Sequence, residues 1–90
     1  MKRAIALTEK DSVATMIDKA NRGEDVEVTI GRRKIVITAE DEIPFGHKIA
    51  LKEIKKGEKV IKYGEPIGQA TRDIKKGEHV HVHNIKSIMV

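Results

Sequence analysis

The sequence contains no cysteine and no tryptophan, and its only aromatic residues are Phe45 and Tyr63. A chain without cysteine has no disulfide bond, no thiolate nucleophile and no thiolate ligand for a metal. With so few aromatic side chains, the core must be built from Ile, Val, Ala and Leu. Ninety residues make one domain, so we expect a single domain over residues 1–90, with modest stability unless it assembles with a partner.

Long apolar runs are also absent. The N-terminal run AIAL, residues 4–7, is too short for the core of a signal peptide. No segment approaches the roughly 20 apolar residues that a membrane-spanning helix needs. We therefore expect a cytoplasmic protein without a membrane partner.

Charge of one sign is not concentrated anywhere in the chain. The 18 Lys and Arg residues against 14 Asp and Glu residues give a net charge of +4, and the two signs interleave, as in KKGEK at residues 55–59. Nucleic-acid-binding surfaces usually combine a basic stripe with stacking aromatic residues or a known motif, and neither is present. The pattern is typical of a solvated surface, and we expect no nucleic-acid partner.

The apolar spacing predicts one helix, in the segment SVATMIDKANRG that follows Asp11. Asp11 is a suitable N-cap, Gly23 is a suitable stop, and apolar residues recur between them with helical spacing. These residues are Val13, Met16, Ile17 and Ala20.

The remaining segments alternate with a period of two, which predicts short strands. After a first strand at 4–7, they cover residues 25–30, 34–39, 47–51, 59–63, 66–70 and 79–83. EIKKGEKV at 53–60 recurs as DIKKGEHV at 73–80, with six of eight positions identical. Two copies are too few for a solenoid, so we expect two similar turns that each lead into a strand of a mostly β fold with one short helix.

Three of the four histidines, His79, His81 and His83, occupy alternate positions of the C-terminal strand. Side chains two residues apart on a strand share a face, with Cα atoms about 6.6–7 Å apart, so neighbouring imidazoles can converge on one ion. All three would need a bend in the strand. A metal site, a set of proton-transfer groups and an exposed polar face all remain open, and neutral imidazole suits Zn, Fe, Cu or Ni.

The fourth histidine, His47, follows a Pro44–Gly46 turn and opens a strand. Functional side chains are common at such loop–strand edges. Lys48 should point to the opposite face. The sequence has neither a Ser-His-Asp arrangement of any specificity nor a glycine-rich phosphate-binding loop.

Taken together, DSVATMI, IPFGHKIALKEIKKGEKVIKYGEPIGQAT and DIKKGEHVHVHN resemble the small subunit, or N-terminal domain, of the altronate and galactarate dehydratase family. The resemblance extends from Asp11 to Lys86 and is most specific at Gly46-His47-Lys48 and at residues 79–84. It implies an SAF-type β-clip fold and the elimination of water from a sugar acid. It also implies a divalent metal, typically iron(II), held mainly with a separate large dehydratase subunit that carries most of the active site.

The resemblance also implies site residues. Those expected to be catalytic are His47, His81 and Asp11, and those expected to bind substrate are Lys48, His83 and Asn84. The alternate spacing of the C-terminal histidines, rather than the resemblance, makes His79, His81 and His83 the residues expected to bind metal. The family's usual Asp-Asn-Val reads Asp11-Ser12-Val13 here, which leaves the identity of the sugar acid open. The same small domain occurs in sulfolactate sulfo-lyase, so a sulfo-lyase subunit is an alternative, as is a non-catalytic SAF-like binding module. We expect the isolated chain to be inactive, with a homo-oligomer as an alternative state.

Overall fold

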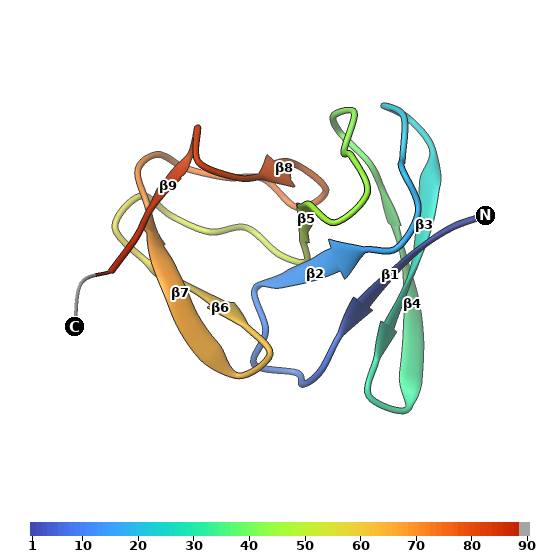
Figure 1. The fold of residues 1–90 in the computed structure, drawn as a ribbon, viewed down its shortest axis with the longest axis horizontal. Coiled ribbons are helices and arrows are strands. Elements are labelled where there is room, and N and C mark those ends of the chain that lie inside the picture. Colours follow the sequence, from blue (N-terminus) through green and yellow to red (C-terminus); the bar gives the residue numbers. More distant parts are fainter. Residues whose placement is uncertain (89–90) are drawn as a thin grey trace.

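The computed structural model describes residues 1–88, which form β-strands joined by short turns (Figure 1). The fold is mostly β, as expected, and the described residues contain no helix. The strands are β1 (Lys2–Ala6), β2 (Val13–Met16), β3 (Asp25–Ile30), β4 (Arg33–Thr38), β5 (Lys48–Ala50), β6 (Lys59–Lys62), β7 (Glu65–Ala70), β8 (His79–Val80) and β9 (Ile85–Lys86).

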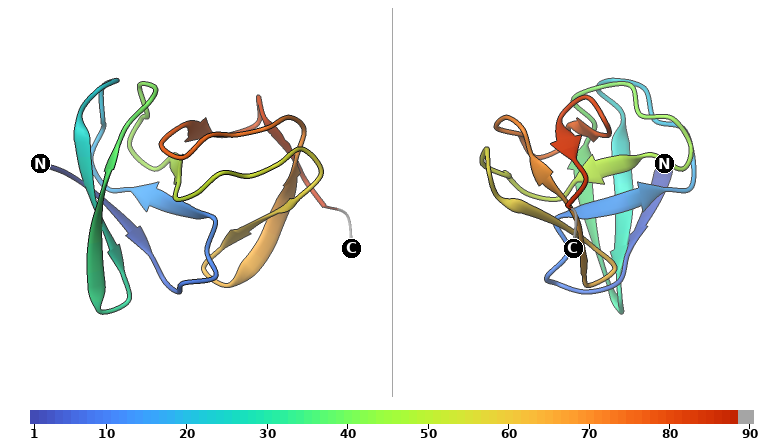
Figure 2. Two further views of the ribbon diagram at one scale, coloured as in Figure 1. Left: turned by 180° about the vertical axis from the view of Figure 1, so that it is seen from behind. Right: turned by 60° about the vertical axis from the view of Figure 1, so that its left-hand side comes forward.

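The strands form two sheets. The larger sheet has the order β4-β3-β1-β2-β5-β8, and the smaller has the order β6-β7-β9. Strands β1 and β3 are parallel, whereas the other paired strands are antiparallel. The smaller sheet lies at one end of the long axis and the β3–β4 hairpin at the other, with β2 and β5 between them (Figures 1 and 2).

The expected helix after Asp11 is wrong, because this segment contains strand β2. Strand β2 pairs with β1 on one side and with β5 on the other, with Ala4 opposite Met16 and Val13 opposite Ala50. Its two faces contribute to two separate clusters of buried apolar side chains, so its residues are apolar in a pattern that also fits a helix. Pairing with other strands determines whether such a segment is a helix or a strand, since the local propensity of its residues is only a weak preference.

The repeat seen in the sequence at two places occurs four times in the structure. We call the copies the first to fourth glycine turns: residues 20–26, 43–49, 54–60 and 74–80. Each has Ala or Ile at its first position, Gly at its fourth and Val or Ile at its seventh, and each leads into a strand, namely β3, β5, β6 and β8.

The four glycine turns share one backbone geometry. Their glycines have φ values between 80° and 91°, and the fifth residue's N–H donates to the second residue's carbonyl at 2.9–3.1 Å. The first residues pair across isolated bridges, Ala20 with Ile43 and Ile54 with Ile74. A positive φ at the third residue of a four-residue turn defines a type II turn and favours glycine there. The two halves of the molecule are therefore each organised around a pair of equivalent turns.

Candidate functional site

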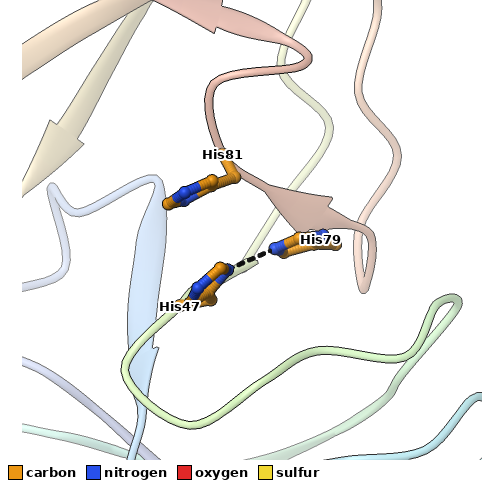
Figure 3. Close-up of side chains that lie close together, drawn as sticks. All are labelled: His47, His79 and His81. Carbon is orange, nitrogen blue, oxygen red and sulfur yellow. Dashed lines mark hydrogen bonds between the residues drawn. The ribbon is translucent and has the colours of Figure 1, made fainter.

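Three imidazole rings gather at one place on the larger sheet (Figure 3). His47 comes from the second glycine turn, His79 from β8 and His81 from the segment just after β8. One ring nitrogen from each lies within 4.8 Å of the others. A hydrogen bond of 2.8 Å joins His47 Nδ1 and His79 Nε2, and the His47 and His81 rings stack with centroids 4.0 Å apart. We call these three residues the imidazole cluster.

The register of β5 and β8 explains why the cluster forms. These strands are antiparallel, with Lys48 opposite Val80 and Ile49 opposite His79. Continued by one position, the same register places His47 opposite His81. Because side chains alternate between faces along a strand, Lys48 and Val80 point to the opposite side from their histidine neighbours. Two segments more than 30 residues apart in the sequence thus bring their imidazoles to the same face.

The C-terminal histidines do not lie on one straight strand. Strand β8 ends at Val80, and residues 81–84 form a turn that leads into β9. His83 is exposed, with its ring centroid 4.9 Å from that of His79, but it lies outside the group of three converging nitrogens. The structure therefore groups His47 with His79 and His81, where the alternating sequence had suggested His83 as the third ligand.

Asn84 closes the turn that carries His81 and His83. Its side chain is fully buried, with Oδ1 accepting from the His81 N–H at 3.0 Å and Nδ2 donating to the His79 carbonyl at 2.8 Å. The family resemblance predicts that Asn84 binds substrate. Both ends of its amide are instead engaged with the backbone of the histidine segment, which favours a role in holding the imidazoles in place.

Asp11 is also buried and engaged with backbone N–H groups. Its Oδ2 accepts from Leu7 at 2.8 Å and Thr8 at 3.3 Å, and its Oδ1 accepts from Gly64 at 2.7 Å. Burial acts to raise the pKa of Asp11, but these N–H donors outweigh it and hold the pKa below its ordinary value. The carboxylate ties the β1–β2 loop to the tip of the β6–β7 hairpin, a geometry that favours a structural role over the catalytic role expected from the sequence.

The electrostatics of the site keep two of its imidazoles neutral. Burial, followed by the charges of His83, His47 and His81, lowers the pKa of His79 to about 4. Burial, followed by His47 and the Lys48 ammonium, also lowers the pKa of His81 below its ordinary value. Neutral imidazoles can accept protons or ligate a metal at physiological pH.

Lys48, expected to bind substrate, lies half-buried on β5. Burial and the neighbouring Lys62 both lower its pKa. No acidic group forms a salt bridge with Lys48 or Lys62 among residues 1–88. A partly desolvated cation without an acidic partner is suited to binding the carboxylate of a ligand.

The imidazole cluster fits a divalent transition metal. Three converging nitrogens without any thiolate suit iron(II), zinc and similar ions. His81 Nδ1 is buried and has no hydrogen-bond partner among residues 1–88, a costly arrangement that ligation or a partner's donor would relieve. The remaining ligands would have to come from outside these three residues.

Asp41 is a contributor to the site that the sequence did not reveal. Its Oδ2 accepts from the His79 backbone N–H at 3.0 Å, which fixes the start of β8 against the segment before the second glycine turn. An acidic residue in a short loop carries no sequence signal for this contact, because Asp41 and His79 are 38 positions apart. Within residues 1–88, no helix is long and apolar enough to cross a membrane.

The chain matches the altronate/galactarate dehydratase SAF domain over residues 2–88. It is 40% identical over 87 residues to altronate dehydratase of Bacillus subtilis (strain 168), a match that covers 97% of this chain and 17% of that protein. Altronate dehydratase of Escherichia coli (strain K12) is 43% identical over 77 residues, or 86% of this chain and 15% of that protein.

A second kind of relative is the (2R)-sulfolactate sulfo-lyase subunit alpha of Paracoccus pantotrophus, 48% identical over 60 residues. That match covers 67% of this chain and 90% of the subunit. The chain thus spans less than a fifth of the altronate dehydratases but corresponds to most of a separately named lyase subunit. The match over residues 2–88 and the 40–43% identities establish that the chain belongs to the altronate/galactarate dehydratase SAF-domain family.

Proposed function

We propose that this chain is the small, SAF-domain subunit of a sugar-acid hydro-lyase, which eliminates water from altronate or a close relative together with a large catalytic subunit. The observation that carries the proposal is the convergence of His47, His79 and His81, which come from two distant segments. Within the described part of the chain, the buried Nδ1 of His81 has no hydrogen-bond partner. Family membership adds the type of reaction, because the relatives are lyases.

The chemistry of dehydration explains why imidazoles and a cation would be useful here. The proton α to a carboxylate is weakly acidic, so its removal requires positive charge or hydrogen-bond donors at the carboxylate. Lys48 leaves β5 on the side opposite to the imidazoles, but its ammonium is close enough to lower the pKa of His81. This long side chain would bind that carboxylate, with His83 contributing at the exposed rim. His47 and His81 would move protons to or from the reacting carbon and the leaving hydroxyl, since neutral imidazole serves as base and imidazolium as acid.

A divalent metal, in our proposal iron(II), would be held mainly by ligands of the large subunit, with His79 of the imidazole cluster as the ligand from this chain, so that His47 and His81 stay available for proton transfer. Bound there, it would supply Lewis-acid stabilisation of developing negative charge. The protein's own part is to hold the three nitrogens close together, which it does through the β5–β8 register and the Asn84 side chain.

The test is reconstitution. The chain would be mixed with a large dehydratase subunit and ferrous iron, and the dehydration of altronate followed. We expect turnover only when both proteins are present. Turnover by the large subunit alone at the same rate, or by this chain alone, would contradict the proposal.

A second candidate is the small subunit of a sulfo-lyase, which the 48% identity to the Paracoccus alpha subunit favours. It would use the same imidazoles to expel sulfite in place of hydroxide. Measuring sulfite release from sulfolactate beside altronate dehydration separates the two. If neither reaction occurs and the isolated chain binds sugar acids tightly by calorimetry, a non-catalytic binding module becomes the better description.

A further inference from the structure

The second glycine turn, which carries His47, departs from the other three at its second, third and fifth positions. The third residue is Phe45, where the other turns have Arg22, Lys56 or Lys76; the second and fifth positions are the two that contact each other in the other turns. In the first, third and fourth turns the fifth residue is glutamate: Glu24, Glu58 and Glu78. The second residue of those turns, Asn21, Lys55 or Lys75, has a backbone N–H. In the second turn these two positions are occupied by His47 and Pro44.

The two positions are in contact in the other three turns. The glutamate Oε1 accepts from the N–H of the second residue, at 2.7 Å from Asn21 to Glu24 and at 2.6 Å from Lys55 to Glu58. Lys75 and Glu78 form the same hydrogen bond. In each of these turns the side chain at the fifth position is therefore occupied within its own turn, as an acceptor for a backbone donor.

The second turn cannot make this contact, because proline has no N–H. Its backbone is otherwise unchanged: His47 N donates to the Pro44 carbonyl at 3.1 Å, and Gly46 has a φ of 80°. The side chain at position 47 therefore does not accept a hydrogen bond from its own turn, as the glutamates of the other turns do. It projects instead to His79, with the 2.8 Å contact between ring nitrogens.

Ordinary turn preference does not explain Pro44. In a type II turn proline is favoured at the second of the four residues, which here is Phe45, whereas Pro44 is the first. The feature that sets Pro44 apart from Asn21, Lys55 and Lys75 is the missing donor. Its loss coincides with the one turn in which a histidine replaces the glutamate.

We propose that Pro44 is a positioning residue for the imidazole cluster: by removing the backbone N–H that the fifth residue accepts in the other glycine turns, it releases His47 to pair with His79. The significance of this pairing for catalysis rests on the proposed function, but the pairing itself is a property of the chain alone. The second turn thus keeps the backbone of the other glycine turns but presents a histidine to the imidazole cluster.

The test is to restore a backbone N–H at position 44. Lysine occupies this position in the third and fourth turns, so Pro44→Lys is compatible with the backbone, and Pro44→Ala provides a second variant with a smaller side chain. The readout is the ring ¹⁵N NMR spectrum of the isolated full-length chain at neutral pH, which reports the tautomers and hydrogen bonding of His47 and His79. We expect both variants to lose the His47–His79 hydrogen-bond signature, because the new N–H competes for the His47 ring.

A stability cycle gives an independent readout. His47→Glu alone places a carboxylate where no N–H can meet it, whereas His47→Glu with Pro44→Lys rebuilds the turn found at residues 54–60. We expect the double variant to unfold at a higher temperature than His47→Glu alone. The matched control is Lys55→Pro with Glu58→His in the third turn, which should leave the His47 and His79 ring signals unchanged.

The outcomes separate this inference from the proposed function. An unchanged His47–His79 signature in folded Pro44→Lys and Pro44→Ala would overturn it, as would the absence of any rescue of His47→Glu by Pro44→Lys. Loss of the His47–His79 signature, together with rescue of His47→Glu by Pro44→Lys, would support the positioning role of Pro44 even if the reconstituted complex showed no lyase activity. The missing activity would count only against the proposed function. In an active complex, Pro44→Lys should lower kcat about tenfold with little change in KM, the size of effect that loss of a supporting contact produces.

Discussion

At the scale of single residues, Asp11 and the imidazoles illustrate how far the type of a residue indicates its task. The sequence could single out every histidine and Asp11, because these side chains carry titratable groups. It could not tell which of them face one another. Asp11 turned out to accept three backbone N–H groups, and Asn84 to bind the histidine segment, contacts that depend on chain segments brought together only by the fold.

The Asp11 geometry predicts a stability defect without a catalytic one. Asp11→Ala leaves the N–H groups of Leu7, Thr8 and Gly64 without their acceptor. We expect a loss of about 3 kcal/mol in the free energy of unfolding, measured by urea denaturation. Ser12→Ala is the matched control, since the Ser12 hydroxyl accepts only from Ile61, and should cost about 1 kcal/mol. Unchanged stability with lost turnover would instead make Asp11 a catalytic residue.

The depressed pKa of His79 predicts a loss of stability in mild acid. The folded pKa is about 4, against an ordinary value of 6.5, so between these values the unfolded chain binds more protons than the folded one. Stability should therefore fall as the pH decreases from about 6.5 towards 4. Urea midpoints measured across this range for the metal-free wild type and His79→Gln should diverge, with the variant less sensitive. Parallel profiles would mean that His79 is not desolvated in this way.

At the scale of elements, the alternation of apolar and polar residues and the turn residues predicted most of the strands. The prediction was wrong for the segment of β2, whose conformation is determined by pairing with other strands. Strand β2 is paired on both sides and contributes to both apolar clusters, which gave its segment a helix-like spacing. The sequence showed the repeat at only two of the four glycine turns, because residues 20–26 and 43–49 share little sequence with the lysine-rich copies, although the backbone is the same. The His47–His79 contact depends on the β5–β8 register, which no local pattern encodes.

The glycine turns provide a matched pair for testing their packing. Gly57 and Gly77 occupy the same position with φ values of 91° and 90°, so alanine is strained at both by about 1 kcal/mol. A Cβ at Gly57 would meet nothing within 4 Å, whereas one at Gly77 would collide with the Thr38 carbonyl oxygen. Gly77→Ala should therefore lower the thermal midpoint clearly more than Gly57→Ala. Equal shifts would show that the fourth turn does not pack against β4 as described.

At the scale of the whole molecule, residues 1–88 form a small double-sheet domain that carries three clustered imidazoles. The imidazole cluster offers three converging nitrogens. Among residues 1–88, the buried His81 Nδ1 has no hydrogen-bond partner and Lys48 has no acidic partner. The altronate dehydratases to which it is similar are about six times longer than the matched segment, as the 17% and 15% coverages indicate. These observations support our proposal that the domain forms one side of an active site that a larger partner completes.

The most direct test of this account is the turnover of the complex reconstituted from the large subunit and either His47→Ala or His81→Ala, measured with saturating ferrous iron and substrate. Assembly is checked by co-purification, and Lys55→Ala on the third glycine turn serves as the control. We predict that both histidine variants assemble normally but lose at least about 100-fold in kcat, the usual contribution of a positioned proton-transfer group. Complexes that assemble and retain full activity would contradict it.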